Sequence, residues 1–196
     1  MPLTNDDVLA LFTECGALLH GHFVLTSGRH ADTYFEKFDV LRHPAQVEKL
    51  CAHIAAAVRD ARLEVDVVLG PTTLGIVLAY EVAKQLGATA AYGEKGSDGH
   101  RFLRRPDHLR ANERVFVVDD VLTTGGSIRE CVDLVASVGA SLVGVGVLVD
   151  RTGASADFGV PLVSALSLSV QSWAPDEVPK WLSATPISRP GSTGKK

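Results

Sequence analysis

The chain has 196 residues, which is long enough for one well-buried domain and too short for two large ones. Its net charge of −4 gives no reason to expect nucleic acid or an anionic membrane as a partner. Cys15, Cys51 and Cys131 lie far apart, so neither a disulfide framework nor a zinc site is expected. Residues 1–12 lack the features of a secretion signal, and no apolar run reaches the roughly 20 residues that cross a bilayer, so we expect a cytoplasmic protein.

The first 60 residues are predicted to form a helix, a hairpin and a second helix. Apolar residues at helical spacing indicate a helix over residues 6–19, which Thr4 or Asn5 can cap. Two extended runs then flank the turn-forming pair Ser27-Gly28, which indicates a β-hairpin. A proline suited to the first turn opens the second helix, over residues 44–59.

Beyond residue 60, apolar strands alternate with helices. The predicted strands cover residues 65–70, 88–93, 114–120, 142–150 and 162–170, and the predicted helices cover residues 74–86 and 127–138. The apolar runs are unbroken, which is typical of parallel strands that are covered on both faces. We therefore expect an α/β fold with a doubly wound, mainly parallel sheet and helices on both faces. In such sheets ligands bind at the carboxyl ends of the strands.

One of these strands ends in two carboxylates, Asp119 and Asp120, and a turn rich in hydroxyls and glycine follows at residues 123–126. The turn presents backbone N–H groups without side-chain obstruction, and the helix that begins at Ser127 adds its positive dipole end. These features predict a site for a terminal phosphate, with the hydroxyl groups as extra donors. The two carboxylates suit ribose hydroxyls, and a carboxylate left over can help to hold a divalent metal.

The glycine-rich stretches also allow simpler or different interpretations. Ser127 and Glu130 fit a capping box, S-x-x-E, which would explain the serine but not the two carboxylates before it. Residues 70–75 have the glycine spacing of a P-loop, but Ile76 stands where the lysine should be. The GxG at residues 144–146 lies inside an apolar strand, where a dinucleotide fingerprint does not fit.

Residues 115–130, VFVVDDVLTTGGSIRE, closely resemble the phosphoribosyl-pyrophosphate signature of the type I phosphoribosyltransferases. In that family the acidic pair holds the ribose hydroxyls, and the loop that follows cradles the 5′-phosphate through backbone amides. The resemblance implies the family's fold and, as cofactor, Mg²⁺ carried by the substrate near the acidic pair, with no direct protein ligand assigned. It implies that the sugar-phosphate site consists of Asp119, Asp120, Val121, Leu122, Thr123, Thr124, Gly125, Gly126 and Ser127.

The loop after the strand 65–70, GPTTLG, is by itself only a turn into a helix. In the family a loop in this place binds pyrophosphate through its backbone. By that resemblance Thr72, Thr73 and Gly75 are expected to contact the pyrophosphate group.

Two further stretches resemble the orotate enzymes of the family. Residues 21–35, GHFVLTSGRHADTYF, match an N-terminal segment with an F-x-L-x-SG core and a following aromatic pair. Arg151 ends a strand where these enzymes carry an arginine that meets the carboxylate of the base, for which a guanidinium is a natural bidentate partner. The alternative is a surface arginine paired with Asp150. The expected orotate site consists of Thr26, Tyr34, Phe35, Thr123 and Arg151; many orotate enzymes have a lysine where Thr26 stands.

Residues 94–105, EKGSDGHRFLRR, resemble a mobile basic loop of the orotate enzymes that reaches across a dimer and neutralises the departing pyrophosphate. Lys95 matches one basic position of that loop, and His100 or Arg101 can take the place of another in this shortened version. With Asp120, these are the expected catalytic residues. The alternative is a solvated basic loop.

The resemblance implies a single domain over residues 1–186, in which residues 1–43 form a small hood of helix and hairpin that contributes to the base site. Residues 187–196 are expected to be a flexible tail. The implied reaction joins orotate to phosphoribosyl pyrophosphate, giving orotidine 5′-monophosphate and pyrophosphate in pyrimidine (UMP) biosynthesis. A homodimer with a shared active site is expected, without nucleic acid or membrane partners. The alternatives are a transferase for another base, and a non-catalytic regulator that senses the sugar donor and binds nucleic acid.

Overall fold

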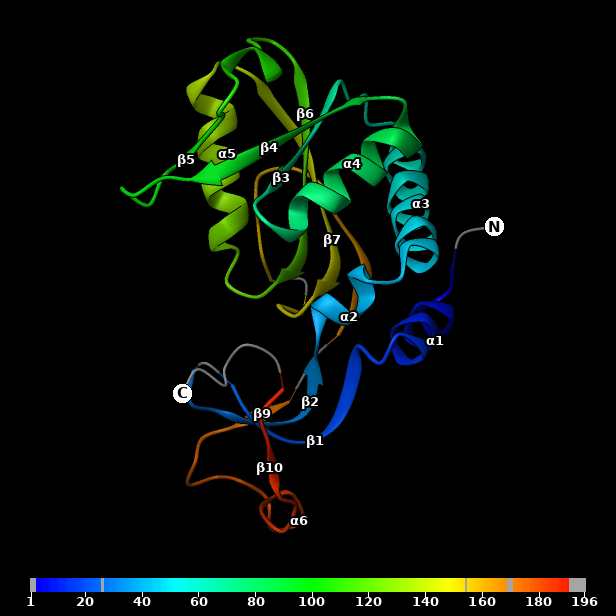
Figure 1. The fold of residues 1–196 in the computed structure, drawn as a ribbon, viewed down its shortest axis with the longest axis vertical. Helices are drawn as coiled ribbons and strands as arrows, with labels where there is room; N and C mark the ends of the chain where they lie inside the picture. The colour runs from blue at the N-terminus through cyan, green and yellow to red at the C-terminus, as the bar shows by residue number, and fades with distance from the viewer. Residues whose placement is uncertain (1–2, 26, 154, 169–170, 191–196) are drawn as a thin grey trace.

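The computed structural model in Figure 1 describes residues 3–25, 27–153, 155–168 and 171–190. The first half contains α1 (Asn5–Glu14), β1 (Leu18–Val24), β2 (His30–Phe35), α2 (Lys37–Leu41), α3 (Pro44–Asp60), β3 (Val67–Pro71), α4 (Leu74–Leu86) and β4 (Thr89–Lys95). The second half contains β5 (Arg101–Phe102), the 3₁₀ turn η1 (Pro106–His108), β6 (Arg114–Leu122), α5 (Gly126–Ser137), β7 (Ser141–Asp150), β8 (Leu162–Ser167), β9 (Ser172–Trp173), α6 (Lys180–Ser183) and β10 (Ile187–Ser188).

The main sheet confirms the predicted doubly wound α/β fold. Its strand order is β5-β4-β3-β6-β7-β8, and every neighbouring pair is parallel except β4 with β5. From β3 the chain passes through α4 to β4 on one side, whereas β6 continues through α5 to β7 on the other side. The order of the strands therefore reverses between β3 and β6, and the carboxyl ends of these two strands flank the crevice where such sheets bind ligands.

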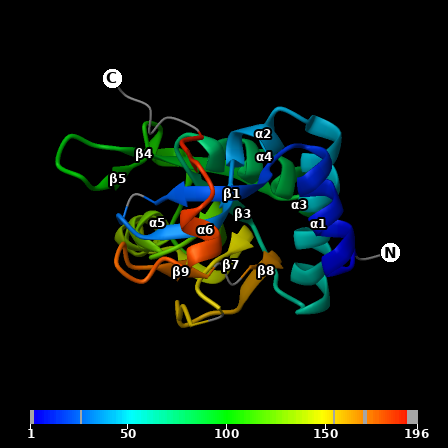
Figure 2. The ribbon, with the colours of Figure 1, turned by 90° about the horizontal axis from the view of Figure 1, so that it is seen from below.

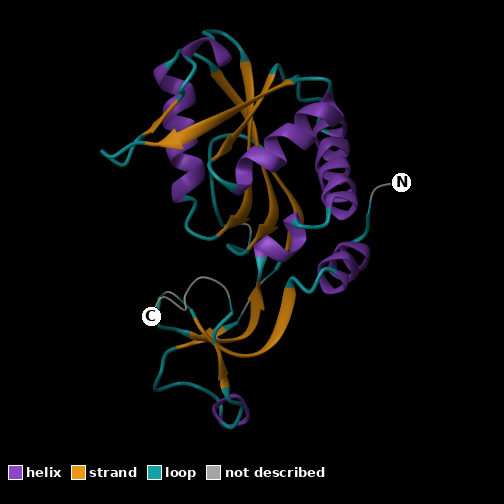
Figure 3. Cartoon of the chain, viewed as in Figure 1, coloured by secondary structure: helices purple, strands orange, loops and turns teal. Residues whose placement is uncertain are grey.

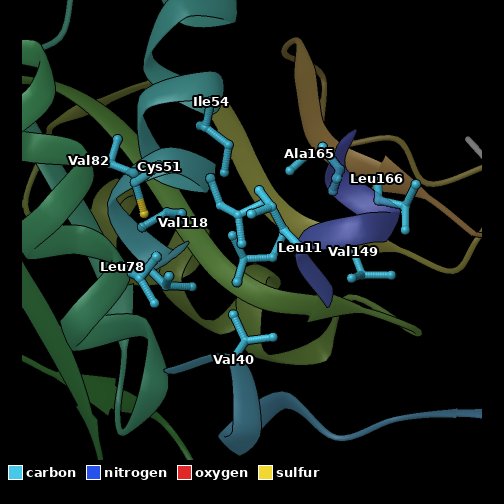
Figure 4. Close-up of a cluster of buried hydrophobic side chains, with 14 of the residues drawn as sticks. Leu11, Val40, Cys51, Ile54, Leu78, Val82, Val118, Val149, Ala165 and Leu166 are labelled. Atoms are coloured by element: carbon cyan, nitrogen blue, oxygen red, sulfur yellow. The ribbon is translucent and has the colours of Figure 1, made fainter. Parts of the chain in front are cut away.

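Helices cover both faces of the main sheet, as the unbroken apolar runs predicted. Alternate residues of one strand enter two separate cores: Phe116 and Val118 pack with α1, α3 and α4, whereas Val115 and Val117 pack with α5. Figure 4 shows the first core, in which Val118 lies among Cys51 and Ile54 of α3 and other apolar side chains. Because both faces of β6 are packed against apolar side chains, the residues at its carboxyl end are held in fixed positions.

The predicted hairpin is present as β1 and β2, but its sheet is larger than the sequence indicated. The strand order is β10-β1-β2-β9, so two short segments from the C-terminal part of the chain complete the sheet on either side. Arg29 fixes one of them by donating two hydrogen bonds to Ser172, at 3.0 Å to the hydroxyl and 2.6 Å to the carbonyl oxygen. We call this four-stranded sheet with α6 the hood. Figure 1 shows it beyond the lower end of the main sheet, with α2 between the two parts, and in Figure 2, seen from that end, it lies in front of the main sheet.

Figure 3 colours the helices and strands of the chain, and the largest differences from the sequence-based expectation lie at three of their boundaries. The first helix ends at Glu14 rather than at residue 19, because Gly16 adopts a positive φ of 68° and Leu18 already begins β1. Ile187 and Ser188 were expected in a flexible tail but pair with β1; residues 191–196 lie outside the described part. β8 ends at Ser167, and residues 169–170 of the predicted strand also lie outside it. Among the described helices, none is long and apolar enough to cross a bilayer.

Candidate functional site at the strand ends

The acidic pair lies at the carboxyl end of β6, next to the point where the strand order reverses. Asp119 and Asp120 are 8% and 4% exposed. Asp119 Oδ1 accepts a hydrogen bond from the Asp120 N–H at 2.8 Å, and Asp120 Oδ1 accepts one from the Val121 N–H at 2.6 Å. Since neighbouring residues of a strand point to opposite faces of the sheet, the two carboxylates have different surroundings.

The environment of Asp119 opposes the ionisation of its carboxyl group. Burial, and then the negative charge of Asp120, raise the pKa of Asp119 to about 7. Lys37 and Arg101 act in the opposite direction with smaller effects. A buried carboxyl group that titrates near neutrality at a strand end is a feature of functional sites more than of structural ones.

Asp120 has a cationic partner that the sequence interpretation did not include. The Lys37 ammonium at the start of α2 lies 3.1 Å from Asp120 Oδ2 and 3.4 Å from Asp120 Oδ1. The two residues are 83 positions apart, and no local motif marks the lysine.

The turn after β6 forms a small open cavity of about 270 Å³, lined by Asp119, Val121, Thr123, Thr124, Gly125, Gly126, Ser127, Ile128 and Glu130. Gly125 has a positive φ of 77° and is the N-cap of α5, with no side chain capping the helix. The first N–H groups of α5 therefore lack a side-chain acceptor, which is the arrangement that favours a bound anion. Leu122, also expected in this site, is fully buried and packs in the core below the turn.

The capping box weighed for Ser127 and Glu130 is wrong, because the helix begins earlier, at Gly126. Glu130 instead pairs with two basic side chains of the neighbouring hairpin. One oxygen lies 3.1 Å from Lys95 Nζ and the other lies 3.1 Å from Arg101 Nε.

The loop after β3 is folded tightly on itself at the other side of the crevice. A Cβ on Gly70 would lie 2.0 Å from the carbonyl oxygen of Gly75, and a Cβ on Gly75 would lie 2.5 Å from Pro71 Cδ. Both positions therefore require glycine. The loop contains a cis peptide bond between Thr72 and Thr73, and the Thr72 N–H donates to the Gly93 carbonyl oxygen at 3.1 Å.

A larger cavity of about 630 Å³ lies between the hood and the strand ends. It is lined by Val24, Leu25, Ser27, Tyr34, Phe35, Lys37, Val121, Thr123, Thr124, Arg151 and Ser172. The structure thus brings together four of the five residues expected at the base site, Tyr34, Phe35, Thr123 and Arg151; Thr26 lies outside the described residues. Tyr34 packs on Phe23 with ring centroids 5.5 Å apart, and Phe35 on Phe12 at 4.9 Å.

Arg151 brings a guanidinium group to this cavity, which can bind a carboxylate in a bidentate way. Burial lowers the pKa of its guanidinium from the ordinary value, and the Tyr34 phenol opposes that effect. None of the ion pairs found among the described residues involves Arg151. Asp150, weighed as its partner, accepts hydrogen bonds from the Thr152 N–H at 2.8 Å and from the Thr152 hydroxyl at 2.7 Å.

The predicted basic loop is the turn of the β4–β5 hairpin, which projects from the body of the molecule in Figure 2. Lys95, His100 and Arg101 line a separate cavity there, not the one under the hood. The Arg101 side chain is 4% exposed and also donates to the Gly93 carbonyl oxygen at 2.9 Å. In this conformation Arg101 therefore attaches the hairpin to α5, while Lys95 stays half-exposed beside Glu130, at the edge of the phosphate-sized cavity.

The residues present fit a metal that is bound mainly by a substrate. No cluster of three or more potential metal ligands occurs within the described part of the chain. The acidic pair supplies two carboxylates beside the anion-binding turn, which is too few for a closed protein site for Mg²⁺ but suits an ion that a phosphate-bearing ligand brings with it.

Comparisons with known proteins agree with this geometry. The family model described as "Phosphoribosyl transferase domain" matches residues 39–157. Over 190 residues the chain is 45% identical to an orotate phosphoribosyltransferase of Heliobacterium modesticaldum, covering 97% of this chain and 99% of that protein. It is 40% identical over 190 residues to one of Caulobacter vibrioides, with 97% of each covered.

A solved structure gives the same result. The crystal structure of orotate phosphoribosyltransferase from Aeropyrum pernix matches with a TM-score of 0.69 and 30% identity, covering 82% of this chain and 93% of that chain. The relatives and the arrangement of the strand ends lead to one conclusion: the chain belongs to the orotate phosphoribosyltransferase family.

Proposed function

We propose that this protein transfers the 5-phosphoribosyl group of phosphoribosyl pyrophosphate to orotate, giving orotidine 5′-monophosphate and pyrophosphate in pyrimidine (UMP) biosynthesis. The observation that carries the proposal is the cavity under the hood, which is lined by Arg151 and Tyr34 as well as by Thr123 and Thr124 of the anion-binding turn. A base carboxylate and a ribose phosphate can therefore be held at the same time, on either side of the atoms that react. The names of the relatives support the same pair of substrates.

The sugar donor is bound in this proposal by the two loops that flank the crevice. The 5′-phosphate binds to the N–H groups and hydroxyls of residues 123–127, and Asp119 and Asp120 accept hydrogen bonds from the ribose hydroxyls. The tight loop at residues 70–75 offers its backbone to the pyrophosphate group, with Thr72, Thr73 and Gly75 nearest to it.

Catalysis then depends on positioning and on charge rather than on a covalent intermediate. Displacement at the anomeric carbon builds positive charge on the ribose and negative charge on the leaving pyrophosphate. Asp119 and Asp120 would help to hold a Mg²⁺ that the sugar donor brings with it, and this ion would supply positive charge against the negative charge that develops on the leaving group. Lys95, with His100 or Arg101, is proposed to close over the leaving group, which requires the β4–β5 hairpin to move from its present position against Glu130.

The same proposal includes a homodimer with a shared active site. Large apolar side chains are exposed on adjoining elements: Val77 and Tyr80 of α4, Tyr92 of β4, and Phe102 of β5, between 40% and 67% exposed. A second copy covering this surface would bring its own β4–β5 hairpin near the interface, as the expected loop exchange needs.

Location in the cytoplasm is part of the proposal as well. The three cysteines are free and buried, which suits a reducing compartment where thiols persist.

An assay of base consumption tests the proposed function. The purified protein is incubated with phosphoribosyl pyrophosphate and Mg²⁺ together with orotate, uracil or hypoxanthine in parallel. We expect orotate to be consumed only when the sugar donor is present, and the other two bases to be left unchanged. Faster consumption of uracil or hypoxanthine would show a transferase for another base. No consumption of any base, with a salt-sensitive gel shift of RNA or DNA, would favour the regulator.

A further inference from the structure

Lys37 occupies a place that none of the recognised motifs explains. It is the first residue of α2, the short helix between the hood and the main sheet in Figure 1, and only Glu36 separates it from β2. Glu36 caps the helix by accepting a hydrogen bond from the Phe38 N–H at 3.4 Å, and the buried Val40 anchors it in the core. The position of Lys37 at the cavity is therefore set by its own helix and does not depend on its ion pair with Asp120.

The charged side chains that line the cavity under the hood all have the same sign. Of the eleven residues that line it, only Lys37 and Arg151 carry a charge, and both are cationic. The substrate pair that this cavity would take has two anionic parts beyond the 5′-phosphate, the base carboxylate and the pyrophosphate. Arg151 suits the carboxylate, which leaves the ammonium group for the second anion. The sequence offers no lysine at position 26, where many orotate enzymes have one.

The two partners of the ion pair differ in their exposure to solvent. The Asp120 side chain is 6% exposed, whereas the Lys37 side chain is 42% exposed and its ammonium lies 3.1 Å from the carboxylate. An ammonium group has three N–H donors and can keep one on Asp120 while it directs the others to a ligand in the cavity. Asp120 likewise keeps the capacity to accept a hydrogen bond from a ribose hydroxyl beside Lys37 and the Val121 N–H, because its two oxygens accept about four hydrogen bonds.

We propose that Lys37 is a substrate-binding residue that bridges Asp120 and the pyrophosphate oxygens of the sugar donor. In the free protein it neutralises Asp120. When the ribose hydroxyls bind to Asp120, the ammonium group contacts the anionic pyrophosphate. It thereby supplies a positive charge in a chain that has Thr26, and not a lysine, at position 26. The inference rests on the proposed function, since it takes phosphoribosyl pyrophosphate as the ligand.

A structural role makes a different prediction. If the lysine only held Asp120 in place, its removal would weaken binding of the ribose, so ribose 5-phosphate, which has no pyrophosphate, would lose as much affinity as the sugar donor. A direct contact with the pyrophosphate predicts a loss of affinity for the sugar donor that ribose 5-phosphate does not share, including in the absence of orotate, when no turnover occurs.

The test compares Lys37→Met, Lys37→Arg and the wild type by calorimetric titration with phosphoribosyl pyrophosphate and Mg²⁺, with ribose 5-phosphate, and by steady-state kinetics. Loss of a charge-assisted hydrogen bond is expected to weaken donor binding by about tenfold or more in Lys37→Met. The KM for orotate should stay within about twofold, since that substrate meets Arg151 instead. Lys37→Arg keeps the charge and should recover most of the lost donor affinity.

Lys84→Met serves as the matched control, because Lys84 also forms ion pairs, at 3.2 Å with Glu81 and 3.3 Å with Glu48, on the side of α4 that faces α3. It should bind the donor like the wild type. Wild-type donor affinity in Lys37→Met, an equal rise of both KM values, or an equal loss of affinity for the donor and for ribose 5-phosphate would overturn the proposal. A wild-type protein that neither binds the donor nor consumes orotate would instead refute the proposed function itself, so the two failures are distinguishable.

Discussion

The environment of Asp119 predicts that this carboxylate lowers the stability of the protein at neutral and alkaline pH. Burial and the neighbouring Asp120 raise its pKa from an ordinary 3.8 to about 7. The folded protein therefore keeps a proton on Asp119 between these two values, where the unfolded chain has lost it. Stability falls as the pH rises through that window, by about 1.4 kcal/mol for each pH unit, and stays at the lower level above pH 7.

Asp119→Asn removes the ionisable group with little change in shape. Above pH 7 the variant is expected to be more stable than the wild type by up to about 4 kcal/mol, which corresponds to the full interval from 3.8 to about 7. At pH 5 the wild type has lost only part of that stability. The advantage of the variant should therefore grow by about 2–3 kcal/mol between pH 5 and pH 8. The variant should also lose most of its turnover, as happens when a group that destabilises the fold is kept for function.

Urea unfolding followed by circular dichroism at pH 5 and pH 8 measures this difference, without substrate or Mg²⁺ so that binding does not add to the stability. An advantage that is the same at both pH values, within about 0.5 kcal/mol, would refute the reasoning, because a change in packing alone has no such pH dependence.

Three further substitutions test other parts of the site. Arg151→Ala should raise the KM for orotate by about tenfold or more while the KM for the sugar donor changes little; an equal rise of both in steady-state kinetics would mean a structural arginine. Gly70→Ala places a Cβ against the Gly75 carbonyl oxygen and should lower the unfolding free energy by roughly 1–3 kcal/mol, with weaker pyrophosphate binding; a calorimetric titration like that of the wild type would argue against the loop's role. Tyr80→Glu buries a charge in the proposed dimer surface and should give monomers in sedimentation velocity, whereas an unchanged dimer would exclude that surface.

The sequence predicted the parts of the site that depend on local pattern. The strand with its acidic end, the glycine turn and the helix behind it are contiguous, so they could be recognised together, and the helix over residues 74–86 was predicted with the bounds that the structure has. Because parallel strands present their carboxyl ends at one edge, the loops at residues 70–75 and 123–127 could be assigned to one crevice before their positions were known.

The parts that could not be predicted depend on contacts between distant residues. Lys37 meets Asp120 across 83 positions, and nothing near the lysine marks it. The partners of Glu130 could not be predicted either, because the S-x-x-E pattern suggests only a local cap, whereas the observed partners lie on a hairpin about 30 residues earlier in the chain. The segments that complete the hood, β9 and β10, have two residues each, which is too short for any periodicity to appear.

The predicted first helix, residues 6–19, is longer than the observed one for a related reason. Leu18 and Leu19 continue the helical spacing of apolar residues, but they lie in β1, beyond a glycine with positive φ. Periodicity alone does not distinguish a helix that continues from a strand that begins with apolar residues after a tight turn.

The most direct test of the central claim, that the end of β6 holds the reacting sugar, is the turnover of Asp120→Asn. Orotate consumption with phosphoribosyl pyrophosphate and Mg²⁺ is measured beside the urea midpoint of the same preparation. If Asp120 binds the ribose hydroxyls and Lys37, turnover should fall by about a hundredfold or more while the variant stays folded at the assay temperature. Wild-type turnover in the folded variant would contradict the assignment of the ribose to this strand end.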